Sequence, residues 1–176
     1  KHFSIRLKKQ VCCFVTDMAI KFVLILAFVA LGTTVGVAYS GRLTSRRRYF
    51  EEIVALINSI SGDIKFRQAT VATIVSEGEY KAIKLTTDAF VRYVTNESKD
   101  LKIPRQELSE REYTVIVELF SALGTYDLDT QLFVLDNYKA KINEFYASAK
   151  DKENKYAATA IKLGVLIGLG AGVVVL

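Results

Sequence analysis

The sequence predicts an all-α protein, in which an antiparallel bundle of about five to six helices is flanked by a transmembrane helix at each end. Apolar residues make up 51% of the 176 residues, and they form nearly unbroken runs at the two ends while the middle carries most of the charge. The middle contains few helix breakers, because the chain has one Pro and its Gly residues gather in the end runs. Apolar residues in the middle recur at steps of three and four, the helical period.

The first 17 residues differ from the rest. They hold an excess of basic residues, both cysteines and the only histidine: Lys1, His2, Arg6, Lys8, Lys9, Cys12 and Cys13, against Asp17. Met18, the only Met, directly precedes an apolar run. We therefore interpret residues 1–17 as a non-native or mis-annotated N-terminal extension. The alternative is a genuine basic extension or the n-region of a signal peptide.

Residues 19–39 are predicted to form the first transmembrane helix. The stretch 22–39 is free of charge and, extended to residue 19, reaches about 30 Å, the thickness of the bilayer hydrocarbon. The alternative, a buried helix of a soluble core, rarely needs apolar residues on every face over this length.

Residues 157–176 are predicted to form a second transmembrane helix or a tail anchor. Residues 163–176 are wholly apolar, and the one charge in the segment is Lys162, whose long stem can extend to the headgroups. Glycines at a spacing of four lie on one face of each terminal helix and predict close helix packing in lipid: Gly32, Gly36, Gly164, Gly168 and Gly172. The alternative is that glycine is simply common in membrane helices.

Basic residues near the two membrane segments set the predicted orientation. Arg42, Arg46, Arg47 and Arg48 follow the first segment, and lysines that include Lys162 precede the second. With Met18 as the start, the positive-inside rule places the central domain, residues 42–156, in the cytoplasm; with residues 1–17 retained, the basic residues on the two sides are nearly balanced. We interpret these five residues as anchors to acidic lipid headgroups rather than as a nucleic-acid site. The bilayer is thus a predicted partner and nucleic acid is not.

The central domain is predicted to contain a series of amphipathic helices. They cover residues 42–60, about 69–76 and about 80–95, with a break or bend at Gly62 and a loop over 96–104. Ser109 and Glu112 have the spacing of a capping box at the start of the next helix, which Gly124 ends. Asp127 is expected to cap the last helix, which continues without a breaker from about residue 129 into the second membrane segment.

This last helix carries a heptad-like apolar seam, formed by Leu132, Leu135, Tyr138, Ile142, Phe145 and Ala149. We expect it to pair in antiparallel fashion with the first helix of the domain, while the middle helices close the bundle.

The sequence predicts no enzyme. Beyond Met18 there is no His and no Cys, so the commonest general base, the thiol nucleophile and most zinc ligands are missing. No phosphate-binding glycine motif occurs. Neighbouring carboxylates such as Glu51 and Glu52 are typical of solvated helix faces. We therefore expect no catalytic residue, no cofactor and no metal.

The layout resembles the stage III sporulation protein AB family from Met18 to the end. Three segments carry the likeness: M-A-I-K-F-V-L-I-L-A leading to R-L-T-S-R-R-R-Y-F-E-E-I, then L-G-T-Y-D-L-D-T-Q, and the apolar finish after Asn154 and Lys155. The middle segment supplies the family-like L-G-x-x-D-x-x-x-Q pattern, made by Leu123, Gly124, Asp127 and Gln131. One departure is residues 66–71, where the family tends to have a Tyr-Gly-x-Thr-Pro-Leu-like turn.

The resemblance implies a non-enzymatic scaffold in the mother-cell membrane around the forespore, within a channel or secretion-like complex. Its bundle would be similar to domains of the platform protein of type II secretion and type IV pilus systems. By that analogy it would bridge a cytosolic secretion ATPase and other membrane subunits of the stage III sporulation complex. Apart from the analogy, a homo-oligomer is a further candidate partner. The alternative functions are a pore or transporter subunit and, less favoured, a membrane-bound hydrolase.

Overall fold

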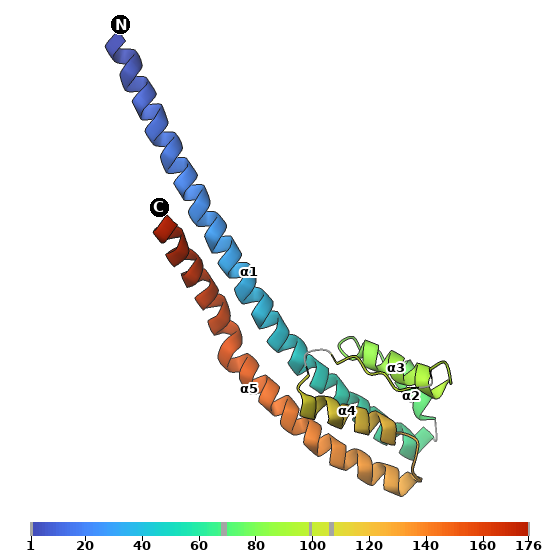
Figure 1. The fold of residues 1–176 in the computed structure, drawn as a ribbon. Coiled ribbons are helices and arrows are strands. Elements are labelled where there is room, and N and C mark those ends of the chain that lie inside the picture. The colour runs from blue at the N-terminus through green and yellow to red at the C-terminus, as the bar shows by residue number, and fades with distance from the viewer. Residues whose placement is uncertain (1, 68–69, 99, 106–107, 176) are drawn as a thin grey trace. The chain divides into compact units, whose positions relative to one another are not determined.

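In the residues that it describes, the computed structural model has five helices (Figure 1): α1 (His2–Arg67), α2 (Val71–Glu77), α3 (Lys84–Val94), α4 (Glu110–Ala122) and α5 (Leu128–Val175). It describes residues 2–67, 70–98, 100–105 and 108–175, with side chains for 18, 20–65, 70–98, 100–105 and 108–174. Within these ranges there is no β-strand. The all-α prediction is therefore confirmed.

The chain divides into two compact units, and α1 and α5 contribute to both. The first unit contains Lys1–Arg42 and Asn154–Leu176, which we call the helix pair. The second contains Leu43–Glu153, which we call the bundle.

The bundle is built around an apolar core to which α1 contributes a continuous stripe. Phe50, Ile53, Ile57 and Ile60 are each at most 1% exposed, and they follow one another at steps of three and four. This period places them on one face of the helix. Side chains of α4 complete this part of the core, with Ile116, Leu119 and Phe120 buried against it.

Gly62 does not break α1, so of the break or bend predicted at that position the break is wrong. The helix continues through Gly62 to Arg67. A glycine inside a helix costs only about 1 kcal/mol relative to alanine. Ile60 and Ile64, on either side of it, both pack on the core, and this packing is sufficient to keep the helix continuous.

The helix α5 runs without interruption, as predicted, and its apolar seam faces the core. Leu135, Ile142 and Ala149 are buried, and the Phe145 ring lies 5.8 Å from that of Phe50 between centroids. In the bundle α1 and α5 run side by side in opposite directions (Figure 1), which confirms the predicted pairing of the first and last helices.

The shorter helices begin at clear local signals. Ser109 and Glu112 form the predicted capping box at the start of α4. Thr70 caps α2, because its side chain accepts a hydrogen bond from the backbone N–H of Thr73. The predicted third helix was too long at its start, because α3 begins at Lys84 rather than at about residue 80.

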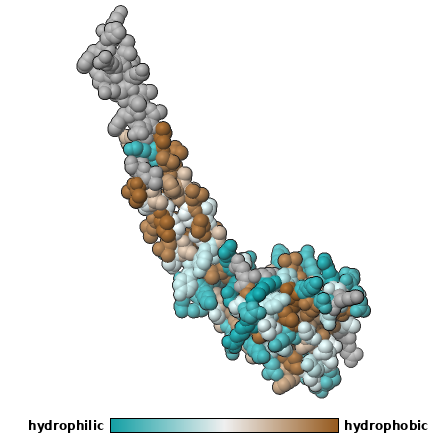
Figure 2. All heavy atoms as spheres, in the orientation of Figure 1, coloured by the Kyte–Doolittle hydropathy of each residue, from teal (hydrophilic) through white to brown (hydrophobic). Residues whose placement is uncertain are grey.

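The helix pair contrasts with the bundle in what it exposes. Figure 2 shows apolar residues gathered on the visible surface of the long helices. The segments Ile20–Lys65 and Leu128–Val174 each contain an apolar stretch long enough to cross a membrane, of which 6% and 17% is buried. A core helix of a soluble protein is mostly buried, so the low burial favours a membrane environment for both.

Candidate functional site

The predicted glycines meet at the contact between α1 and α5 in the helix pair. A Cβ added to Gly36 would lie 2.7 Å from the carbonyl oxygen of Ala160, and one added to Gly168 would lie 2.6 Å from that of Phe28. Gly32 and Gly164 approach each other through their backbones even more closely. The backbones are therefore in direct contact, which only residues without a Cβ permit.

The contact extends along the antiparallel pair to Gly172, whose added Cβ would lie 3.2 Å from the Cα of Ile25. All five predicted glycines thus lie at one interface. In contrast, a Cβ at Gly170 or at Gly41 would meet nothing within 4 Å. The spacing of four therefore separates interface glycines from the others in this region.

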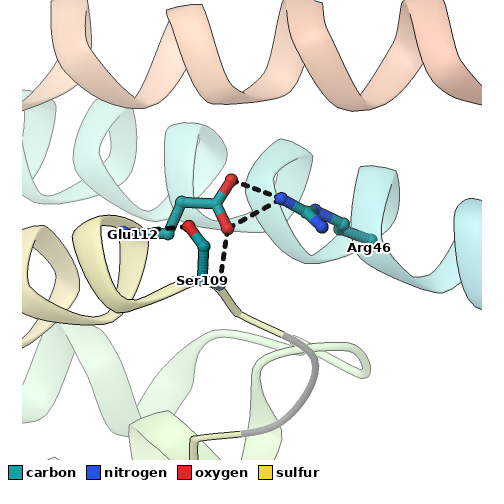
Figure 3. Close-up of polar contacts among 3 residues, drawn as sticks. All are labelled: Arg46, Ser109 and Glu112. Carbon is teal, nitrogen blue, oxygen red and sulfur yellow. Dashed lines mark hydrogen bonds and ion pairs between the residues drawn. The ribbon is translucent and has the colours of Figure 1, made fainter.

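An arginine from α1 and a glutamate from α4 form the main polar contact of the bundle (Figure 3). The Arg46 Nη2 donates to both carboxylate oxygens of Glu112, at 2.6 and 2.8 Å. The Ser109 backbone N–H donates to the same carboxylate at 2.8 Å. The Glu112 side chain is 8% exposed and that of Arg46 27%. The pair therefore joins the start of α4 to α1 in a largely buried place.

The charge of Glu112 depends on these donors. Burial by itself raises the pKa of the Glu112 carboxyl, but the hydrogen bonds from Ser109 and the neighbouring Arg46 cation outweigh it, so the net pKa is lowered. The carboxylate is consequently ionised at neutral pH. The Arg46 Nε is buried without a hydrogen-bond partner, so this guanidinium is only partly satisfied.

A second arginine of α1 connects to α5. Arg47 Nε donates to Glu153 at 2.5 Å, and Thr44 donates to the other oxygen of that carboxylate at 2.8 Å. Arg47 also contacts Glu51 one turn along α1, at 2.5 Å. These contacts hold the two long helices together at the edge of the bundle.

The arginines singled out in the sequence therefore do not act as a set. Arg46 and Arg47 bind carboxylates within the bundle, which gives no support to their interpretation as headgroup anchors. Arg48 and Lys162 are exposed. The headgroup-anchoring role of these four residues and of Arg42 stays a prediction.

The family-like pattern forms the turn between α4 and α5. Leu123 is buried, and Gly124 has a φ of 77°, a left-handed conformation that favours glycine. The Gly124 N–H donates to the Gln131 side-chain oxygen at 3.1 Å, and the Asp127 carboxylate accepts from the Thr130 N–H at 3.4 Å. The pattern thus specifies a capped turn between two helices.

A contact that was not predicted from the sequence starts α3. A Glu52 oxygen accepts from the Ala82 and Ile83 N–H groups, at 2.7 and 3.2 Å. The N-cap residue of α3, Ile83, makes no capping hydrogen bond with its own side chain. The carboxylate from α1 thus serves as a distant helix cap, and no local sequence signal identifies it.

No chemical centre emerges in the part of the chain whose residues the structure describes. Within those residues no group of three or more His, Cys, Asp or Glu side chains is placed to hold a metal ion. What the described site can do chemically is to pack helices and pair charges.

The comparisons with known proteins point to one family. A search of the curated proteins and a search of the solved structures each found no significant match. The family model described as stage III sporulation protein AB matches residues 21–176, which include the glycine contact, the Arg46–Glu112 pair and the turn at Gly124. Because the match covers most of the chain, this protein belongs to the stage III sporulation protein AB family.

Proposed function

We propose that this protein is a non-enzymatic scaffold subunit of a channel or secretion-like complex in the mother-cell membrane during sporulation. The observation that carries the proposal is the division of the chain into an exposed apolar helix pair and a bundle with its own core. Such a division suits a protein that holds partners at a membrane. The family assignment supports the link to sporulation.

In this proposal the bundle faces the cytoplasm. The basic residues next to the two membrane segments, among them Arg48 and Lys162, support this orientation through the positive-inside rule. An anionic inner leaflet attracts such residues by about 1 kcal/mol each. The helix pair then forms the membrane anchor and the bundle surface remains available to cytosolic proteins.

The proposed partners are a cytosolic secretion-type ATPase and other membrane subunits of the stage III sporulation complex. The likeness to platform proteins that the family resemblance implies supports this assignment by analogy of layout. The bundle contributes rigid helix faces, and the glycine contact keeps the membrane anchor compact.

The experiment is affinity purification of the tagged chain from sporulating cells after crosslinking, with identification of the bound proteins by mass spectrometry. We expect the ATPase and membrane subunits of the complex to be enriched over a tagged unrelated membrane protein. Replacing Gly32 with Leu should reduce recovery of the membrane subunits, whereas Gly170→Leu should not. Enrichment of metabolic enzymes alone, in repeated purifications, would overturn the proposal.

A further inference from the structure

A hollow in the bundle lies where the end of α1 and the beginning of α2 meet the α4–α5 turn. It has a volume of about 370 Å³ and is lined by Ile64, Lys65, Val71, Gly124, Tyr126, Leu128 and Gln131. Ile64 and Val71 pack partly on the core and form apolar walls. Tyr126 and Leu128 are each 51% exposed, which is high for large apolar side chains beside a hollow.

Gln131 provides the polar group of this hollow. Its side chain is buried, at 3% exposed, and its oxygen accepts from the Gly124 N–H at 3.1 Å. Because an N–H can only donate, this contact fixes which end of the amide faces the turn. The Gln131 Nε2 is then left buried with no hydrogen-bond partner. A buried donor without a partner costs free energy, which a ligand with an acceptor atom would recover.

The charges around the hollow select the kind of ligand. Lys65 is the charged residue among those that line it. Asp127 and Asp129 are exposed and adjoin the lining residues Tyr126 and Leu128 in the sequence, so two carboxylates stand next to the lining against its one cation. An anionic ligand is therefore disfavoured. A neutral acceptor, such as a main-chain carbonyl, can accept a hydrogen bond from Gln131 Nε2. A basic residue next to that carbonyl can pair with the carboxylates.

From this arrangement we propose that the hollow binds a short segment of a partner protein that carries an apolar side chain, a free main-chain carbonyl and adjacent basic residues. The apolar side chain enters between Tyr126 and Leu128, and the carbonyl accepts from Gln131 Nε2. The basic residues lie against Asp127 and Asp129. This inference deepens the proposed function, since it names the chemistry of a partner, and it rests on that function only for the partner's identity.

The test uses the full chain in nanodiscs of neutral lipid and three fluorescent peptides, measured by fluorescence anisotropy. The first peptide is Lys-Leu-Ala-Leu-Lys, the second has Glu in place of Lys, and the third has Gln in place of Leu; empty nanodiscs measure lipid binding. We expect saturable binding of the first peptide and at least a tenfold weaker affinity for the other two. Comparable binding of all three, or of the first peptide to empty nanodiscs alone, would overturn the proposal.

Matched variants locate the binding. Leu128→Lys places a cation at the hollow and should weaken the first peptide at least tenfold. Leu85→Lys changes a similarly exposed residue on α3, outside the hollow, at 60% exposed, and should leave binding unchanged. Equal losses in both variants would contradict the site, and circular dichroism checks that each retains its helix content.

The side-chain amide signal of Gln131 gives a second readout. In a chain labelled with ¹⁵N at glutamine, this signal should shift as the first peptide is added, and it should not shift with the Gln-containing peptide. No shift at saturation would show that the amide takes no part. Because these probes are synthetic, peptide binding with no recovery of the ATPase from cells would leave the hollow supported and count against the proposed function alone.

Discussion

The two units use opposite means to hold the same two helices together. In the helix pair, α1 and α5 meet through glycines whose backbones touch, and the large side chains point outward. In the bundle, the same helices meet through large side chains: Phe50 is fully buried, and its ring contacts that of Phe145. The difference indicates what surrounds each unit.

Different contacts stabilise helix packing in water and in lipid. Burying apolar area in water stabilises a fold by about 25 cal/mol per Å², so a bundle gains most from large side chains in its core. Lipid offers no such gain between helices, and close backbone approach with its dispersion contacts takes its place. The use of small residues in one unit and large ones in the other is therefore consistent with a membrane environment for the first alone.

The largest expected effect is loss of a ring from the bundle core. Phe120 is fully buried, and its ring lies 5.4 Å from that of Phe90 between centroids. Phe120→Ala should lower the free energy of unfolding by about 3–5 kcal/mol, through lost burial and an unfilled cavity. Urea denaturation in detergent, followed by circular dichroism, measures it. Phe133→Ala is the control, because Phe133 is 67% exposed, and an equal loss there would contradict the assignment of the core.

The next effect concerns the buried charge pair. Glu112→Gln should lower the free energy of unfolding at pH 7 by roughly 1.5–3 kcal/mol, the range for hydrogen bonds to charged groups. Because the folded pKa of Glu112 lies below its usual value of 4.5, the stability it contributes is present above that value and is lost as pH falls through the folded pKa.

Unfolding measured from pH 7 downward should therefore show a decline in acid that is smaller in Glu112→Gln than in the unchanged chain. Replacement of the exposed Glu110, whose side chain is 76% exposed, is the control. Identical acid profiles for the unchanged chain and Glu112→Gln would rule out this role for the carboxylate.

A third prediction distinguishes the two kinds of packing directly. Gly32→Ala should weaken the α1–α5 contact of the helix pair by about 1–3 kcal/mol, because the new Cβ meets the Gly164 backbone, which no rotamer change can move. Energy transfer between labels on the two helices, followed during titration with a denaturing detergent, measures it. Gly170→Ala should be nearly neutral, since a Cβ there meets nothing within 4 Å. If Gly32→Ala left the stability of the α1–α5 contact unchanged, the two backbones would not need to lie this close, and the prediction would be wrong.

The smallest effects come from two glycines of the bundle and should have opposite signs. Gly124→Ala should cost about 1–2 kcal/mol, because alanine is strained at a φ of 77°. Gly62→Ala should stabilise by about 0.5–1 kcal/mol, because the position is helical with open space around it. Urea denaturation compares them, and the same sign for both would contradict the backbone described at one of the two positions.

Much of the fold follows from periodicity and end signals in the sequence. The all-α class, the uninterrupted α5 and the capping box at Ser109 are all predicted, because each depends on residues within one or two helical turns. The break predicted at Gly62 is wrong for a physical reason: the local preference of one glycine is weak beside the packing of Ile60 and Ile64.

The polar contacts could not be predicted in the same way. Arg46 and Glu112 are 66 positions apart, and Glu52 lies 30 positions from Ala82. One sequence without its relatives contains no signal for such pairs. The three consecutive arginines looked alike as a charge cluster, yet the helix points them at different neighbours, because successive residues are rotated by about 100°. Arg46 faces α4 and Arg47 faces α5 as a result.

The Glu52 contact with the start of α3 also bears on the order in which the chain folds. Helices as short as the 11 residues of α3 are unstable alone in water, since the first turn fixes several residues for one hydrogen bond. The Ala82 and Ile83 N–H groups therefore gain their hydrogen bonds to Glu52 only after α1 has formed. We expect α3 to become ordered late, and its amide hydrogens to exchange with solvent sooner than those in the α4 helix.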